Sequence, residues 1–148
     1  SPSRTLVFAN TNARVATLAE QLAETGTRCA QLHKLVSVEA RLDTLRRFRL
    51  GEMDVLVCTD MAARGLDLPG VSLVVEYDFA LNVTEYLHRA GRTARAGGEG
   101  TLVSFVAQGD ENLATAIAAA NSNRIDGVFS RKRGFRRRTR RALDIHSA

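Results

Sequence analysis

An arginine-rich segment in the second half of the chain has residue types and a spacing that suit phosphate chemistry. Three arginines and one histidine lie between positions 88 and 95. If this segment is helical, His88, Arg92 and Arg95 share a stripe roughly 60° wide. The residues that would then face a core are Leu87, Ala90 and Ala94. Because one guanidinium group can donate two parallel hydrogen bonds to phosphate oxygens, the stripe predicts an anion-facing surface. The alternative is a solvated basic face with weak salt bridges.

A second polar segment, residues 59–69, follows an apolar run and combines small residues with two carboxylates. Thr59 offers a hydroxyl and Gly65 an unobstructed amide, and both suit a close approach to phosphate or sugar. Asp60 and Asp67 can orient arginines or accept a hydrogen bond from a ribose hydroxyl. The alternative is a capped, irregular turn in which the two carboxylates only satisfy backbone donors.

The elements that must position these segments alternate between strands and helices. We expect strands at residues 5–9, 28–32, 55–59, 73–77 and 101–107. We expect helices at residues 13–25 and 37–50, a helix beginning at Asn82, and a last helix at residues 110–120. In the helix at 37–50, Val38, Leu42 and Leu45 are predicted to form the apolar face. Short apolar strands alternating with helices indicate an α/β fold, a parallel sheet with helices on both faces. Ligands of such sheets bind at the carboxyl ends of the strands, where Asn10 and Thr59 lie.

Composition divides the chain into two parts. We expect one globular domain at residues 1–120 and a linker with a flexible basic tail at residues 121–148. Residues 1–130 carry 13 Lys and Arg against 15 Asp and Glu, whereas residues 131–148 carry eight against one. The tail predicts attraction to nucleic acid, with a targeting signal or a solubilising extension as alternatives.

The two cysteines and the hydropathy of the chain limit the cellular compartments in which the protein is expected. Cys29 and Cys58 lie in apolar runs without metal-ligand spacing, so we expect buried free thiols, no metal site and a reducing intracellular compartment. Cytoplasm, nucleus and an organelle matrix such as the mitochondrial one all fit this expectation. No apolar run is long enough for a membrane span, and we expect the chain to be part of a longer protein.

Together these segments resemble the C-terminal RecA-like domain of DEAD-box ATP-dependent RNA helicases. Residues 55–69 resemble motif V of that family, residues 86–97 motif VI and residues 6–11 motif IV. The region after motif IV matches at His33, Arg41, Phe48 and Gly51. The resemblance covers about residues 3–120 and implies a RecA-like sheet.

The resemblance also implies roles for individual residues. Arg92 and Arg95 would be arginine fingers that reach the γ-phosphate of ATP, and His88 would link this domain to the catalytic motifs of an N-terminal lobe. On the cofactor side, Asp67 would accept a hydrogen bond from the ribose, with Gly65 beside it. The residues expected to grip RNA are Thr59, Arg64, Gly65, Arg41, Asn10 and Lys34.

Three positions depart from the family pattern. Ala94 and Lys34 stand where the family has glycine, and Val38 stands where it has glutamine. A helical backbone at position 94 would accommodate the extra methyl group. Lys34 replaces a close backbone approach to RNA with a cation, and Val38 removes one polar RNA contact.

The phosphate-binding sequence GxxxxGK[ST] and the Asp-Glu-Ala-Asp sequence are absent. The resemblance therefore implies ATP with Mg²⁺ held mainly by the N-terminal lobe, and a chain that is inactive alone. The partners expected are RNA, that lobe, and a ribonucleoprotein or ribosome-assembly particle. Two other functions remain open, a non-catalytic assembly factor or clamp on such a particle and a DNA-directed helicase lobe.

Overall fold

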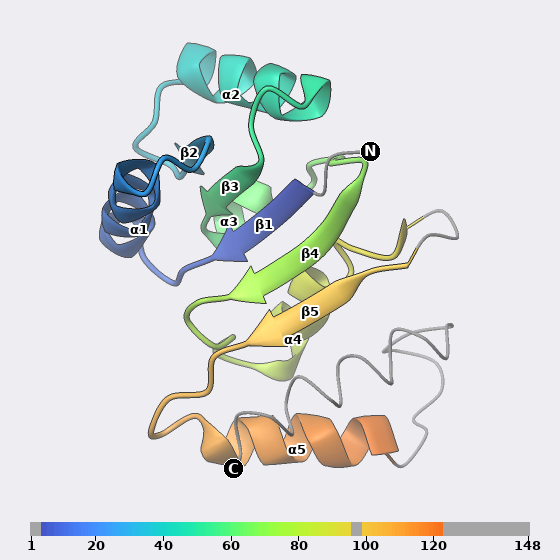
Figure 1. Ribbon diagram of the computed structural model, residues 1–148. Helices are drawn as coiled ribbons and strands as arrows, with labels where there is room; N and C mark the ends of the chain where they lie inside the picture. The colour runs from blue at the N-terminus through green and yellow to red at the C-terminus, as the bar shows by residue number, and fades with distance from the viewer. Residues whose placement is uncertain (1–3, 96–98, 123–148) are drawn as a thin grey trace.

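A computed structural model describes residues 4–95 and 99–122 and shows one five-stranded parallel sheet covered by helices (Figure 1). The strands are β1 (Arg4–Phe8), β2 (Cys29–Leu32), β3 (Val55–Cys58), β4 (Val71–Glu76) and β5 (Thr101–Ser104). Their order across the sheet is β2-β3-β1-β4-β5, and every neighbouring pair is parallel. The predicted α/β class and the RecA-like parallel sheet are confirmed.

The helices are α1 (Asn12–Glu24), α2 (Val38–Leu50), α3 (Asp60–Ala63), α4 (Val83–Ala90) and α5 (Glu111–Ser122). Local capping explains where they begin. The Thr11 hydroxyl accepts a hydrogen bond from the Arg14 amide at the start of α1, and Ser37 does the same for Ala40 at the start of α2. Gly51 ends α2 with φ +78°, a left-handed conformation that glycine adopts without steric cost. The short α3 lies where the sequence predicted an irregular turn.

The sheet order explains why helices lie on both of its faces. The chain runs from β1 outward to β2 and then returns across the sheet to β3, β4 and β5. Since crossovers between parallel strands are right-handed, the reversal of direction places α1 on one face and the later helices on the other. On the α1 face Val7 and Ala9 pack against Val15 and Leu18. The opposite face holds the larger core, which includes Leu6, Phe8, Phe48, Tyr86 and Ile117.

Three details of the predicted structure are wrong. Of the three residues expected on the apolar face of α2, Leu45 is buried as predicted, but Val38 and Leu42 are 61% and 62% exposed, and Phe48 joins Leu45 in the core. The helix that carries the arginine segment ends at Ala90, so the segment is only partly helical. Strand β5 also ends at Ser104, three residues before the predicted boundary.

The cysteines are free thiols with different environments. Cys58 is completely buried in the larger core, whereas Cys29 is partly buried and its thiol donates to the Ala19 carbonyl at 3.2 Å. Burial raises the pKa of both thiols, which keeps them protonated at neutral pH.

Within the described ranges, no helix has the length and apolar character needed to cross a bilayer. The predicted basic tail falls on residues 123–148, outside the described residues, and stays a prediction.

Candidate functional site

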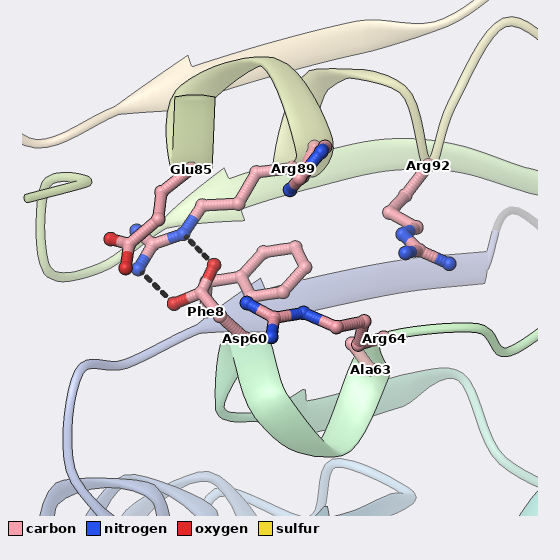
Figure 2. Close-up of a pocket in the computed structure, with 8 residues that line it drawn as sticks. Phe8, Asp60, Ala63, Arg64, Glu85, Arg89 and Arg92 are labelled. Atoms are coloured by element: carbon pink, nitrogen blue, oxygen red, sulfur yellow. Dashed lines mark hydrogen bonds and ion pairs between the residues drawn. The ribbon is translucent and has the colours of Figure 1, made fainter. Parts of the chain in front are cut away.

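The candidate site lies between α3 and α4, whose side chains face each other across the end of β1 (Figure 2). α3 begins directly after β3, and α4 begins after the short connection that follows β4, so both start at the carboxyl edge of the sheet. Their side chains enclose a cavity lined by Phe8, Asp60, Ala63, Arg64, Glu85, His88, Arg89 and Arg92. The structure therefore brings the two polar segments predicted from the sequence into one site.

Arg89 is the centre of a buried polar network in this site, although its side chain is 0% exposed. Its Nε and Nη2 atoms donate to the two carboxylate oxygens of Asp60 at 2.7 and 2.6 Å. Nη2 also donates to Asn10 Oδ1 at 2.6 Å, and Nη1 donates to the Asp78 carbonyl at 2.6 Å and to Glu76 Oε1 at 3.3 Å. One guanidinium thus joins α4 to the start of α3 and to the ends of β1 and β4.

The charge on Arg89 is secured by these carboxylates. Burial alone lowers the pKa of Arg89, but the hydrogen bonds from its guanidinium to Asp60 and the charge of Glu76 outweigh burial and raise it above the ordinary value. The guanidinium also lies over the Phe8 ring, with Cζ 5.1 Å from the ring centroid. An arginine satisfied in this way fixes the position of the helix that carries it.

The sequence prediction gave Arg89 no role, because it divided the segment into an anion-facing stripe of His88, Arg92 and Arg95 and a core-facing side of apolar residues. A signal was nevertheless present in the spacing. Tyr86, Arg89 and Ala90 lie three and four positions apart, and all three are buried. An arginine at a core-facing position of a helix requires carboxylate partners, and Asp60, which was predicted to orient arginines, is one of them.

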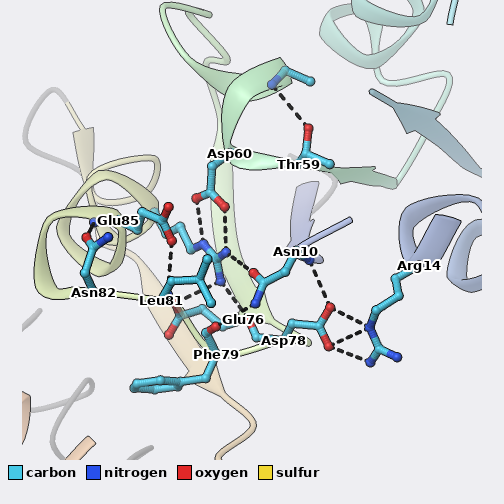
Figure 3. A network of polar contacts seen from close by, with 12 residues as sticks. Asn10, Arg14, Thr59, Asp60, Glu76, Asp78, Phe79, Leu81, Asn82 and Glu85 are labelled. Atoms are coloured by element: carbon cyan, nitrogen blue, oxygen red, sulfur yellow. Dashed lines mark hydrogen bonds and ion pairs between the residues drawn. The ribbon is translucent and has the colours of Figure 1, made fainter. Parts of the chain in front are cut away.

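The network extends from Asn10 to the surface through Asp78 (Figure 3). The backbone amide of Asn10 donates to Asp78 Oδ2 at 2.9 Å, and Arg14 holds both oxygens of the same carboxylate. Partial burial alone raises the pKa of Asp78, but the hydrogen bonds from Arg14 and Asn10 outweigh it and lower the pKa below the ordinary value. The side-chain amide of Asn10 also donates to the Phe79 carbonyl at 3.0 Å, so both of its polar ends are bonded within the domain.

Arg92 and Arg95 lie in the turn after α4, so the predicted helical stripe is wrong. They still come together with Asp67, because both side chains turn toward the loop that joins α3 to β4. Arg92 Nη1 donates to the Leu66 carbonyl at 2.7 Å, and Arg95 Nη1 lies 3.4 Å from Asp67 Oδ1. Arg95 Nε also donates to the Gly91 carbonyl at 2.9 Å. Backbone turns and loop contacts, rather than helical periodicity, produce this convergence.

The electrostatics around Arg92 favour an anion. Burial, together with the nearby charge of Arg95, lowers the pKa of Arg92. Two like charges held near one another are stabilised by any anion that approaches both. The Asp67 carboxylate is 84% exposed and can turn toward a hydroxyl donor instead of Arg95.

The residues predicted to contact RNA come from three segments. Thr59 caps α3, since its hydroxyl accepts from the Ala62 amide at 3.3 Å, and Arg64 and Gly65 follow that helix. Gly65 has φ +74°, and an added Cβ would meet nothing within 4 Å, so its backbone is open to a ligand. Lys34 and Arg41 belong to the β2–α2 region, which also holds His33, whose Nδ1 accepts from the Leu35 amide.

Comparisons with known proteins agree with this geometry. Residues 1–97 match the model of the helicase conserved C-terminal domain. The chain is 42% identical over 140 residues to DEAD-box ATP-dependent RNA helicase 22 of Arabidopsis thaliana, covering 93% of this chain and 24% of that protein. The chain belongs to the helicase conserved C-terminal domain family and is a DEAD-box member of it.

Two solved DEAD-box structures share the fold. The Escherichia coli DEAD-box protein SrmB, bound to regulator of ribonuclease activity A, has 39% identity and a TM-score of 0.74, with 79% of this chain and 69% of that chain covered. Dbp5 of Saccharomyces cerevisiae, bound to RNA and ADP BeF3, has 32% identity and a TM-score of 0.73, with 80% and 32% covered. The chain spans about a quarter (24%) of the length of its curated relative from Arabidopsis thaliana.

Motif VI of this DEAD-box domain contains one strained residue. Ala94, which replaces the family glycine, has φ +56°, so the expectation of a helical backbone at this position is wrong. A left-handed conformation costs an alanine about 1 kcal/mol more than a glycine. Nearby, a Cβ on Gly100 would lie 2.1 Å from Thr93 Oγ1, so the start of β5 passes directly against motif VI and requires glycine.

Proposed function

We propose that this domain supplies Arg92, Arg95 and Asp67 to ATP bound by an N-terminal lobe and thereby takes part in RNA-stimulated ATP hydrolysis that unwinds or remodels RNA. The observation that carries the proposal is the convergence of the motif VI arginines with Asp67 on the motif V loop, with Arg95 Nη1 3.4 Å from Asp67 Oδ1. Guanidinium groups placed at a phosphoryl group in transfer stabilise the charge of the transition state.

The arginines can exchange their present partners for phosphate. Arg92 donates to the carbonyl of Leu66 and Arg95 to that of Gly91, and both acceptors are neutral. The remaining partner of Arg95 is the exposed Asp67 carboxylate at 3.4 Å, and an exposed ion pair of this kind is weak. A neutral hydrogen bond contributes about 1 kcal/mol, whereas one to an anionic phosphate oxygen is stronger. Closure of the two lobes around a nucleotide would therefore favour the exchange. His88, which lines the cavity, would contact the other lobe.

Among the described residues, the three carboxylates that contact Arg89 or Arg14 do not fit a Mg²⁺ site. Asp60 and Glu76 are paired with Arg89, and Asp78 is paired with Arg14. A carboxylate neutralised by arginine is a poor ligand for a hard divalent cation. In this proposal Mg²⁺, the phosphate-binding loop and the water-activating carboxylate all belong to the N-terminal lobe.

RNA is proposed to lie along motif V, where Arg64 and Gly65 are exposed, and along the β2–α2 region. Thr59, Arg64 and Gly65 would contact one stretch of sugar-phosphate backbone, and Lys34 and Arg41 another. Such contacts position RNA without reading its sequence. Asn10 supports the site indirectly, because both ends of its side-chain amide are bonded within the domain. A ribonucleoprotein or ribosome-assembly particle as partner stays a prediction.

The test uses Arg92→Ala and Arg95→Ala in the full-length protein that contains this domain. RNA-stimulated kcat should fall about 10³-fold in each variant, with RNA affinity retained, because an arginine finger acts on the transition state. Arg46→Ala is the matched control, since Arg46 is an exposed arginine paired with Asp43 on α2. Unchanged turnover in both finger variants would refute the proposal and favour a clamp that holds RNA without this chemistry.

A further inference from the structure

Glu76 is a buried carboxylate that neither the nucleotide nor the RNA assignments explain. It is the last residue of β4, its side chain is 0% exposed, and the residue two positions before it on the same face is the buried Val74. Removing a carboxylate from water costs several kcal/mol unless charged and polar partners surround it. Glu76 therefore needs compensating contacts, and their locations indicate its role.

Three separate elements provide these contacts. Ser104, at the end of β5, donates its hydroxyl to Glu76 Oε2 at 2.5 Å. The backbone of Ala80, in the connection between β4 and α4, hydrogen bonds to the same carboxylate. Arg89 of α4 donates Nη1 to Oε1 at 3.3 Å. Glu76 thus ties the last strand, the connection and the helix of motif VI to one point inside the domain.

Arg89 has a second carboxylate, Asp60, which follows β3, whereas Glu76 ends β4, and β1 lies between these two strands in the sheet. Asp60 comes from α3 in motif V, whereas Glu76 comes from β4. With both carboxylates in place, the guanidinium is bonded to α3 and to β4 at once. A movement of α3 therefore cannot carry Arg89 and α4 away from β4. With Glu76 uncharged, Asp60 would be the only anionic partner of the guanidinium, beside the neutral acceptors Asn10 Oδ1 and the Asp78 carbonyl.

The position of Arg89 sets the position of Arg92. α4 has only eight residues, and Arg89 lies in its last turn. The Arg92 amide donates to the Arg89 carbonyl at 3.1 Å, which places the motif VI turn directly on that last turn. A shift of α4 would therefore move Arg92 relative to the Leu66 carbonyl and to any phosphate beyond it.

We propose that Glu76 is a positioning residue, whose buried carboxylate holds Arg89 and, through it, α4 and the motif VI arginines in their working place. The kinetic part of this inference rests on the proposed function of Arg92 and Arg95. The structural part, that Glu76 restrains α4, does not depend on that function.

The test is Glu76→Gln in the full-length protein, because glutamine keeps the size and the Ser104 contact but removes the charge. kcat should fall about ten-fold, with KM for ATP and half-saturation by RNA unchanged, since a small misplacement of a transition-state group lowers the rate more than binding. Hydrogen exchange of the α4 amides should become about ten-fold faster, with α1 amides unchanged.

Val15→Ala is the matched control for loss of stability. Val15 is fully buried on the α1 face of the sheet, away from motif VI. This variant should speed exchange in α1 and leave kcat unchanged. A ten-fold loss of kcat in Val15→Ala as well would attribute the effect of Glu76→Gln to general destabilisation and overturn the proposal.

The exchange measurement separates this inference from the proposed function. Unchanged α4 exchange in Glu76→Gln overturns the restraint by Glu76, whatever the finger variants do. If α4 exchange rises in Glu76→Gln but kcat does not fall, while Arg92→Ala is inactive, the positioning role is overturned. If Arg92→Ala and Arg95→Ala both turn over normally, the proposed function fails, and faster α4 exchange still supports the restraint.

Discussion

The pH dependence of stability in Glu76→Gln is the most direct test of how this domain holds its buried carboxylate. Burial raises the pKa of Glu76 from 4.5 to about 7, against the opposing effects of Ser104 and Arg89. Because the pKa is higher in the folded state, ionisation of Glu76 lowers the global free energy of unfolding, even though the ionised form is the one that restrains Arg89 and α4. The stabilising contribution is complete below pH 4.5 and is lost as pH rises through 7.

The size of the effect follows from the displaced pKa. One pKa unit corresponds to about 1.4 kcal/mol, so linkage predicts that the free energy of unfolding falls by about 2.5 kcal/mol between pH 5 and pH 8 on account of Glu76. Glutamine cannot ionise, so the variant loses this dependence. The unfolding free energy of Glu76→Gln minus that of the unmodified chain should therefore increase by about 2.5 kcal/mol over the same range.

Urea unfolding of both chains at pH 5, 6, 7 and 8 measures this difference, and subtraction removes the titration of groups that the two share. The neighbouring groups that titrate or carry charge are Asp60, Asp78, Glu85, His88, Arg14 and Arg89. A difference that stays constant from pH 5 to pH 8 would refute the reasoning, because it would mean that the carboxylate is not desolvated as its burial indicates. If Glu76→Gln is more stable than the unmodified chain at pH 8 but has a lower kcat, the loss of activity comes from misplaced side chains and not from lower stability.

Two further predictions follow from the motif VI turn and from the tail. Ala94→Gly should raise the free energy of unfolding by about 1 kcal/mol, because it relieves an alanine in the left-handed conformation. The control Ala90→Gly, inside α4, should lower the free energy of unfolding. If urea titrations show an equal loss of unfolding free energy in both variants, position 94 is not strained. Deleting residues 131–148 should weaken RNA binding and flatten its salt dependence, because the segment carries eight Lys and Arg. An unchanged salt slope in a titration from low to high salt would instead indicate an address signal or a protein-binding arm.

Patterns within single segments predicted most of the architecture. Strand and helix positions came from runs of apolar residues and from local caps such as Ser37 and Gly51, whose effects reach only a few residues. The direction of the sheet followed from the alternation of strands and helices. These features depend on contacts close in sequence, so one sequence is enough to predict them.

Features set by distant contacts were predicted less well. The arginine segment looked helical throughout, but α4 ends at Ala90 and the chain then takes a left-handed residue at Ala94. The apolar face of α2 was assigned to Val38, Leu42 and Leu45, but only Leu45 of these is buried, together with Phe48. Periodicity gives a face to a helix, but only packing decides which part of that face is buried.

The sequence by itself determined the fold class, the family motifs and the charged groups available for phosphate and RNA. Tertiary structure alone decided which arginine is structural and which are free to act. Arg89 is bonded to Asn10, which is 79 positions away in the chain, and to carboxylates from α3 and β4. Arg92 and Arg95, only a few residues further on, keep neutral or exposed partners. The physical reason is burial, because a guanidinium removed from water must be neutralised by whichever carboxylates the fold brings to it, whereas one near solvent stays available to a ligand.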